Sequence, residues 1–99
     1  SWLSAQGATV AVASPDFDWR RHYLDYQTVL ASRTSGGQPL EQRQALAKTL
    51  RESGDDAAAA VADGILLSAI DYSMLLDARE RYRATYRRFF RDWDVLLTP

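Results

Sequence analysis

The last third of the chain, from Asp71 to Pro99, constrains the fold more than any other stretch. Large apolar side chains recur there at steps of three and four residues, the spacing that places them on one face of a helix. The members of this stripe are Tyr72, Leu75, Leu76, Tyr82, Tyr86, Phe89, Phe90 and Trp93. At 100° per residue they cover an arc of roughly 140°, the width of a core-facing surface. The pattern predicts one long helix over residues 71–93.

The period changes after Trp93. Val95, Leu96 and Leu97 are consecutive and apolar, which is typical of a strand buried on both faces. Pro99 cannot donate to a sheet ladder, so it closes the run. The pattern predicts a short strand over residues 94–98.

Residues 1–15 predict the end of a helix followed by a strand. Gly7 comes directly after the helical residues Ser1–Gln6, where a left-handed residue usually terminates a helix. Thr9–Ala13 is a short β-prone run, and Ser14-Pro15 breaks it.

Three further helices are predicted between these ends, over residues 18–33, 40–53 and 55–69. Asp16 or Asp18 can cap the first, and the Asp55-Asp56 pair can cap the third. Gly64 and Ser68 weaken the third helix, so we expect a bend or break between Gly64 and Asp71. The fold class is therefore mainly α with one or two short β-strands, in a single unit of residues 1–99.

Composition excludes several classes of protein. The 99 residues are 46% hydrophobic and 25% charged, as in an ordinary globular chain, and the net charge of −1 supplies no field for nucleic acid or anionic membranes. Without cysteine there is no disulfide framework and no thiolate site. No apolar run approaches the roughly 20 residues that span a bilayer, and no signal peptide is visible. We expect a cytoplasmic protein without membrane or nucleic-acid partners. The first residue, Ser1 instead of Met, leads us to expect a trimmed piece, so secretion stays open as the alternative.

The segment DYSMLLDARERYRATYRRFFRDWDVLLTP resembles the late segment of the amidase-signature hydrolases, in which a helix reaches an aromatic pair and an Asp-Val-Leu-Leu-Thr-Pro strand follows. The matching residues are Tyr72, Ala78, Arg79, Phe89, Phe90, Asp94, Val95, Leu96, Leu97, Thr98 and Pro99. The opening WLSAQGATVAVASP resembles the family's helix end, Gly-Ala turn and strand. The resemblance covers both ends of the chain, whereas the middle matches only in helical character.

The resemblance implies a C-terminal fragment of an amidase-signature α/β fold. Such enzymes cleave carboxamide C–N bonds with a Ser–Ser–Lys triad, or release ammonia as amidotransferase subunits. The glycine- and serine-rich segment that carries the triad is missing here: Lys48, the single lysine, lies among polar helical residues, and Ser35-Gly36-Gly37 lacks consecutive serines. We therefore expect no catalytic residue, no cofactor and no metal in this chain, and an inactive isolated fragment. The implied partners are the rest of the parent chain and, in the full enzyme, a small amide.

Four residues are candidates for a site or a buried charge. Trp19, Tyr23 and Tyr72 could line a substrate-pocket wall, although aromatic residues at helical spacing are more often core. Arg79 projects to the middle of the apolar stripe, so we expect a buried guanidinium bound to a carboxylate or to backbone carbonyls.

Other polar groups have a plainer explanation. A metal or general-base role for His22, with Asp18 and Asp25 within a turn, is the alternative to a solvated or locally paired histidine, which we favour. The pairs Asp16/Asp18 and Asp55/Asp56 could act as general acid and base, but helix capping already accounts for them.

Six arginines lie between residues 79 and 91, interleaved with aromatics. They spread around more than half of the predicted helix, and acids such as Glu80 (with Arg83) and Asp92 (with Arg88) sit one turn away, so we favour a self-neutralised surface over a polyanion site. The alternative to the amidase reading is a free-standing helical interaction module whose aromatic helix docks on a partner. In either case the exposed apolar surface predicts self-association into homo-oligomers.

Overall fold

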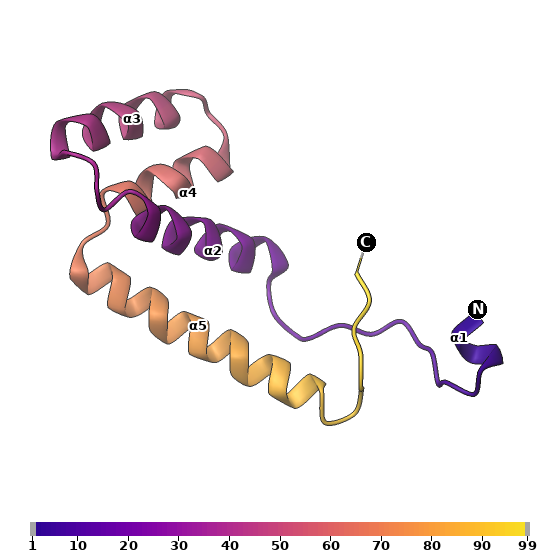
Figure 1. Cartoon of the computed structure of the whole chain (residues 1–99). Coiled ribbons are helices and arrows are strands. Elements are labelled where there is room, and N and C mark those ends of the chain that lie inside the picture. The colour runs from indigo at the N-terminus through magenta and orange to yellow at the C-terminus, as the bar shows by residue number, and fades with distance from the viewer. Residues whose placement is uncertain (1, 99) are drawn as a thin grey trace.

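The computed structural model describes residues 2–98, and the regular secondary structure within that range consists of helices (Figure 1). In chain order they are α1 (Trp2–Ala5), α2 (Trp19–Thr34), α3 (Leu40–Glu52), α4 (Asp56–Ile65) and α5 (Ala69–Phe89). The prediction of a mainly α chain is confirmed.

The helix starts follow from local capping. Asp18, Asp55 and Ser68 precede α2, α4 and α5, and each side chain accepts a hydrogen bond from the backbone N–H three residues on, at 3.0–3.1 Å. These bonds satisfy N–H groups that have no partner within the helix. Of the two candidates for the first cap, Asp18 is therefore the one used.

The predicted break in the fourth helix is also present. Helix α4 ends at Ile65 and α5 begins at Ala69, whereas the sequence predicted helices over 55–69 and 71–93. Helix α5 thus starts two residues early and ends at Phe89, four residues before the predicted end. The apolar stripe continues to Trp93, but residues 90–92 form a turn and residues 93–98 are irregular.

The predicted strands are not formed. Gly7 does adopt a φ of 90° after α1, as predicted for a helix stop. However, residues 8–14 and 94–98 are irregular segments, exposed except for the half-buried Leu96, and no residue from 2 to 98 pairs in a ladder. A strand needs a neighbour to satisfy its backbone groups, and neither segment has one here. The predictions for Ser1 and Pro99 lie outside the described residues.

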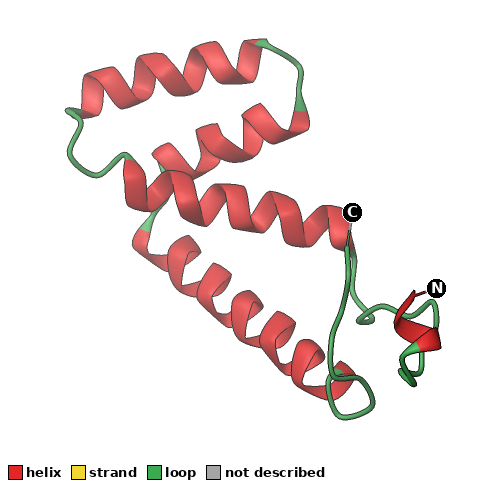
Figure 2. Ribbon diagram, turned by 45° about the vertical axis from the view of Figure 1, so that its right-hand side comes forward, coloured by secondary structure: helices red, strands yellow, loops and turns green. Residues whose placement is uncertain are grey.

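Helices α2, α3 and α4 form the packed part of the molecule, with α4 between the other two (Figures 1 and 2). Its buried apolar residues are Ala31, Ala47, Ala60, Ala62 and Ile65, so the core consists almost entirely of small side chains. This allows the backbones of α2 and α4 to approach each other closely. A Cβ atom on Gly64 of α4 would overlap the carbonyl oxygen of Thr28 and lie 2.8 Å from the Ala31 Cβ. The Thr28 hydroxyl also donates to the Ala60 carbonyl at 2.9 Å.

Among the described helices, α5 packs on α2 alone, and more loosely than α4 does (Figure 2). The segment from α1 to the start of α2 extends away from the other helices (Figure 1). The molecule is elongated, with extents of 58 × 26 × 22 Å and a Cα radius of gyration of 18.0 Å. A compact domain of this length would have a radius of about 13 Å. The space between α2 and α5 is where the candidate site lies.

Candidate functional site

An aromatic cluster joins α5 to the start of α2. Its members are Phe17, Trp19, His22, Tyr82 and Tyr86. Phe17 lies at its centre, with ring centroids 4.5 Å from Trp19, 4.9 Å from His22, 5.3 Å from Tyr82 and 5.2 Å from Tyr86. Three of these four ring pairs are edge-on, a favourable arrangement for aromatic quadrupoles. The cluster fixes one end of α5 against α2.

A hydrogen-bonded chain lies beside the cluster. The Tyr82 hydroxyl donates to Oδ2 of Asp25 at 2.6 Å, and Arg21 donates to Oδ1 through Nε at 2.9 Å, with Nη2 at 2.8 Å. Burial, followed by the hydrogen bond to Asp25, raises the pKa of Tyr82 to about 12. The hydrogen bond with Asp25 raises the pKa of Arg21. Tyr82 therefore stays a neutral donor, and both oxygens of Asp25 are occupied.

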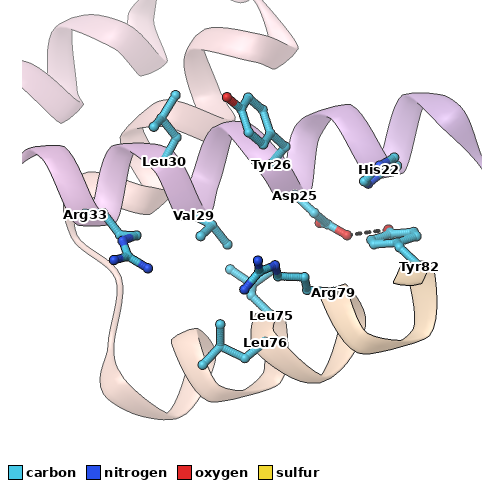
Figure 3. A pocket seen from close by; sticks show the side chains of 10 residues that line it. All are labelled: His22, Asp25, Tyr26, Val29, Leu30, Arg33, Leu75, Leu76, Arg79 and Tyr82. Carbon is cyan, nitrogen blue, oxygen red and sulfur yellow. Dashed lines mark hydrogen bonds between the residues drawn. The ribbon is translucent and has the colours of Figure 1, made fainter. Parts of the chain in front are cut away.

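Beside the hydrogen bonds of Asp25, a groove with a volume of about 250 Å³ opens between α2 and α5 (Figure 3). Its lining residues are His22, Asp25, Tyr26, Val29, Leu30, Arg33, Leu75, Leu76, Arg79 and Tyr82. His22 and Tyr82, with ring centroids 4.3 Å apart, lie at one end, whereas Val29, Leu75 and Leu76 form an aliphatic middle (Figure 3). Apolar walls with a few convergent polar groups are the usual composition of a small-molecule site.

Arg79 is placed differently from its prediction. It is exposed at the groove, and among residues 2–98 its guanidinium has no hydrogen bond or ion pair. The predicted burial with a bound carboxylate or carbonyl is therefore wrong for this structure. The reason is geometric: Arg79 lines an open groove between α2 and α5, so the stripe around it is not covered by the other residues from 2 to 98.

The three predicted pocket-wall residues do not converge. Trp19 belongs to the aromatic cluster, Tyr23 is 46% exposed with the Arg20 guanidinium 6.0 Å from its ring centroid, and Tyr72 is half-buried near the start of α5. None of them lines the groove.

The other polar residues singled out from the sequence have structural roles: ring packing, helix capping and ion pairing. His22 packs against rings, and the described residues contain no group of three side chains able to hold a metal ion. Asp18 and Asp55 serve as caps. In the arginine-rich helix, the predicted pair of Arg83 and Glu80 is formed at 3.1 Å.

The predicted pair of Arg88 and Asp92 is not formed. Arg88 donates to the Thr85 hydroxyl at 3.0 Å instead.

Sequence reasoning missed Phe17 and the Asp25–Tyr82 bond. Phe17 precedes its helix, so helical periodicity could not include it. Asp25 and Tyr82 are 57 positions apart, and only the mutual placement of α2 and α5 brings them together.

No family model, curated protein or solved structure matches this chain. None of the described helices combines the length and the apolar character needed to cross a membrane.

Proposed function

We propose that this chain is the helical part of an amidase-signature hydrolase that acts on carboxamide C–N bonds, and that it is itself non-catalytic. Its role would be to hold two segments of the enzyme's sheet and to cover that sheet with helices. The reacting Ser–Ser–Lys groups would be supplied by the rest of the parent chain, and a small amide would be the substrate.

The observation that carries this proposal is the exposure of apolar side chains in the two segments that resemble the amidase-signature strands. Val10 and Val12 are 52% and 107% exposed, and Val95 and Leu97 are 69% and 73% exposed. Each pair is two residues apart, so in an extended chain both members point to the same side. Apolar side chains presented in this way become buried when the segment adds to a sheet.

The aromatic cluster supports the same role. Phe17 follows the first segment and Tyr86 precedes the second, and their ring centroids are 5.2 Å apart. Both segments therefore leave the helices at the same end of the molecule, where α2 begins and α5 ends (Figure 1). Two strands delivered from one place can enter one sheet.

The test is to recover the reading frame that contains these codons and to assay its product for ammonia release from aryl and alkyl amides. We expect amide hydrolysis by the full product and none by the 99-residue chain. We also expect a glycine- and serine-rich stretch upstream, with a lysine roughly a hundred residues before this segment. A reading frame without that stretch, or an inactive full-length product, would contradict the proposal.

The exposed apolar residues of α5 favour a second candidate, a helical interaction module that self-associates. Ile70 and Met74 are 75% and 62% exposed and lie one turn apart, so they form a patch on one helical face. Sedimentation equilibrium should then show dimers or larger species, and Met74→Glu should shift them toward the monomer. A wild-type chain that remains monomeric at high concentration would refute this candidate.

A further inference from the structure

The groove between α2 and α5 contains two arginines without counter-ions. Arg33 comes from the end of α2 and Arg79 from the middle of α5, and both line the groove (Figure 3). Among residues 2–98, neither guanidinium makes a hydrogen bond or an ion pair. Elsewhere on the same helices, Arg21 and Arg83 have an acid within 3.1 Å. The two groove arginines thus have donors available for an anion.

The one acidic side chain that lines the groove is already neutralised. Asp25 accepts from Arg21 on Oδ1 and from Tyr82 on Oδ2, and its side chain is only 14% exposed. It therefore neither pairs with Arg33 or Arg79 nor offers a free oxygen to a ligand. The charges left facing the groove are both positive, which favours an anionic occupant.

The middle of the groove selects against a fully polar anion. Val29, Leu75 and Leu76 form its aliphatic surface, and their burial by a ligand would release water from apolar area. The volume of about 250 Å³ lies below the range of roughly 300–1,000 Å³ common for drug-sized ligands. A small molecule with one anionic head and one short apolar body fits both properties.

We propose that this groove binds small amphipathic carboxylates, such as a medium-chain alkyl acid. The carboxylate accepts hydrogen bonds from Arg33 and Arg79, for which planar guanidinium groups are well suited. The alkyl body lies on Val29, Leu75 and Leu76. This site goes beyond the proposed amidase function and does not depend on it, because it is formed entirely by residues of α2 and α5.

The experiment is a titration of the ¹⁵N-labelled chain with octanoate, followed through the backbone amide shifts of α2 and α5. Octanamide is the matched probe, since it keeps the alkyl body but lacks the charge. We expect saturable shifts around the groove with octanoate and weaker binding of octanamide. Added salt should weaken octanoate binding, because these exposed charges are screened.

Arg79→Gln and Arg33→Gln should each weaken octanoate binding by about tenfold, as expected for one lost charge-assisted hydrogen bond. Arg81→Gln is the control, because Arg81 is an exposed arginine of α5 that does not line the groove. Its binding should match that of the wild type, and circular dichroism should show equal helicity for all three variants. Equal affinity for octanoate and octanamide, an equal effect of Arg81→Gln, or no saturable shifts would each overturn the proposal. Because no amide is cleaved in this experiment, its failure is distinct from a failure of the amidase assay.

Discussion

Helix α2 packs against two neighbours in two different ways. Against α4 it uses Thr28 and Ala31, which meet Gly64 so closely that no Cβ fits between the backbones. Against α5 it uses the rings of Trp19 and His22 near its start, and a groove runs from His22 along its later turns. The comparison shows that small residues allow a close backbone approach between α2 and α4, whereas the large residues between α2 and α5 leave a groove beside their ring contacts.

The largest effect is expected at the close interface. Gly64→Val should lower the free energy of unfolding by about 3 kcal/mol, because the new side chain overlaps the Thr28 carbonyl and must push α4 away from α2. Denaturant unfolding followed by circular dichroism measures this change. Gly37→Val is the control, since a Cβ there meets no atom within 4 Å. Equal losses for both variants would mean that the α2–α4 approach is not tight.

A mutation in the aromatic cluster should lower the free energy of unfolding less than Gly64→Val, and its effect should be confined to α5. Phe17→Ala should cost about 2 kcal/mol, because it removes the ring that contacts four others from a half-buried position. Hydrogen exchange should become faster in α5 and remain unchanged in α4. Phe90→Ala, at a more exposed ring outside the cluster, should have a smaller effect. Faster exchange across both helices would show that the two interfaces are not independent.

Tyr82→Phe should cost about 1 kcal/mol at neutral pH, the usual value of one hydrogen bond in a partly exposed place. Because the pKa of Tyr82 is raised to about 12 in the fold, from an unfolded value near 10, its contribution is fully present below pH 10. It is lost as the pH rises from about 10 to 12. The variant should therefore show a smaller loss of stability over that window, measured by urea unfolding at several pH values. Tyr72→Phe is the control at neutral pH and should cost less than Tyr82→Phe, because the Tyr72 hydroxyl makes no hydrogen bond among residues 2–98.

The smallest effect is expected at the surface of the α3–α4 pair. Arg51 and Asp63 are joined at 3.0 Å, but their side chains are 50% and 62% exposed. Asp63→Asn should change stability by about 0.3 kcal/mol, since solvent screens such pairs. A loss above about 1 kcal/mol would contradict this expectation for an exposed ion pair.

The features that the sequence predicted well are those decided within a few residues. Caps at Asp18 and Asp55, the stop at Gly7 and the break after Gly64 all depend on neighbouring backbone groups. Helix bounds at the first two long helices also lie within one residue of those predicted. Local chemistry is visible in a single sequence, because the interacting groups are adjacent in it.

The features that the sequence could not predict depend on the relative placement of distant elements. From the sequence alone, Gly64 is a weak helix former. In the structure its missing side chain allows the close contact with Thr28, 36 positions earlier. The sequence predicts a buried Arg79 if another element covers its apolar stripe. In the structure Arg79 is exposed and lines an open groove. The sequence predicts strands at residues 9–13 and 94–98 from β-prone and apolar runs, but ladder formation requires a partner strand, and none forms among residues 2–98.

The elongated shape of the molecule affects how fast it moves in solution. With a long axis of 58 Å and a mass of 11.2 kDa, a single copy experiences more translational friction than a sphere of equal mass. It will elute early from a sizing column and mimic a heavier species, so light scattering is the measurement that tells one extended copy from a true pair.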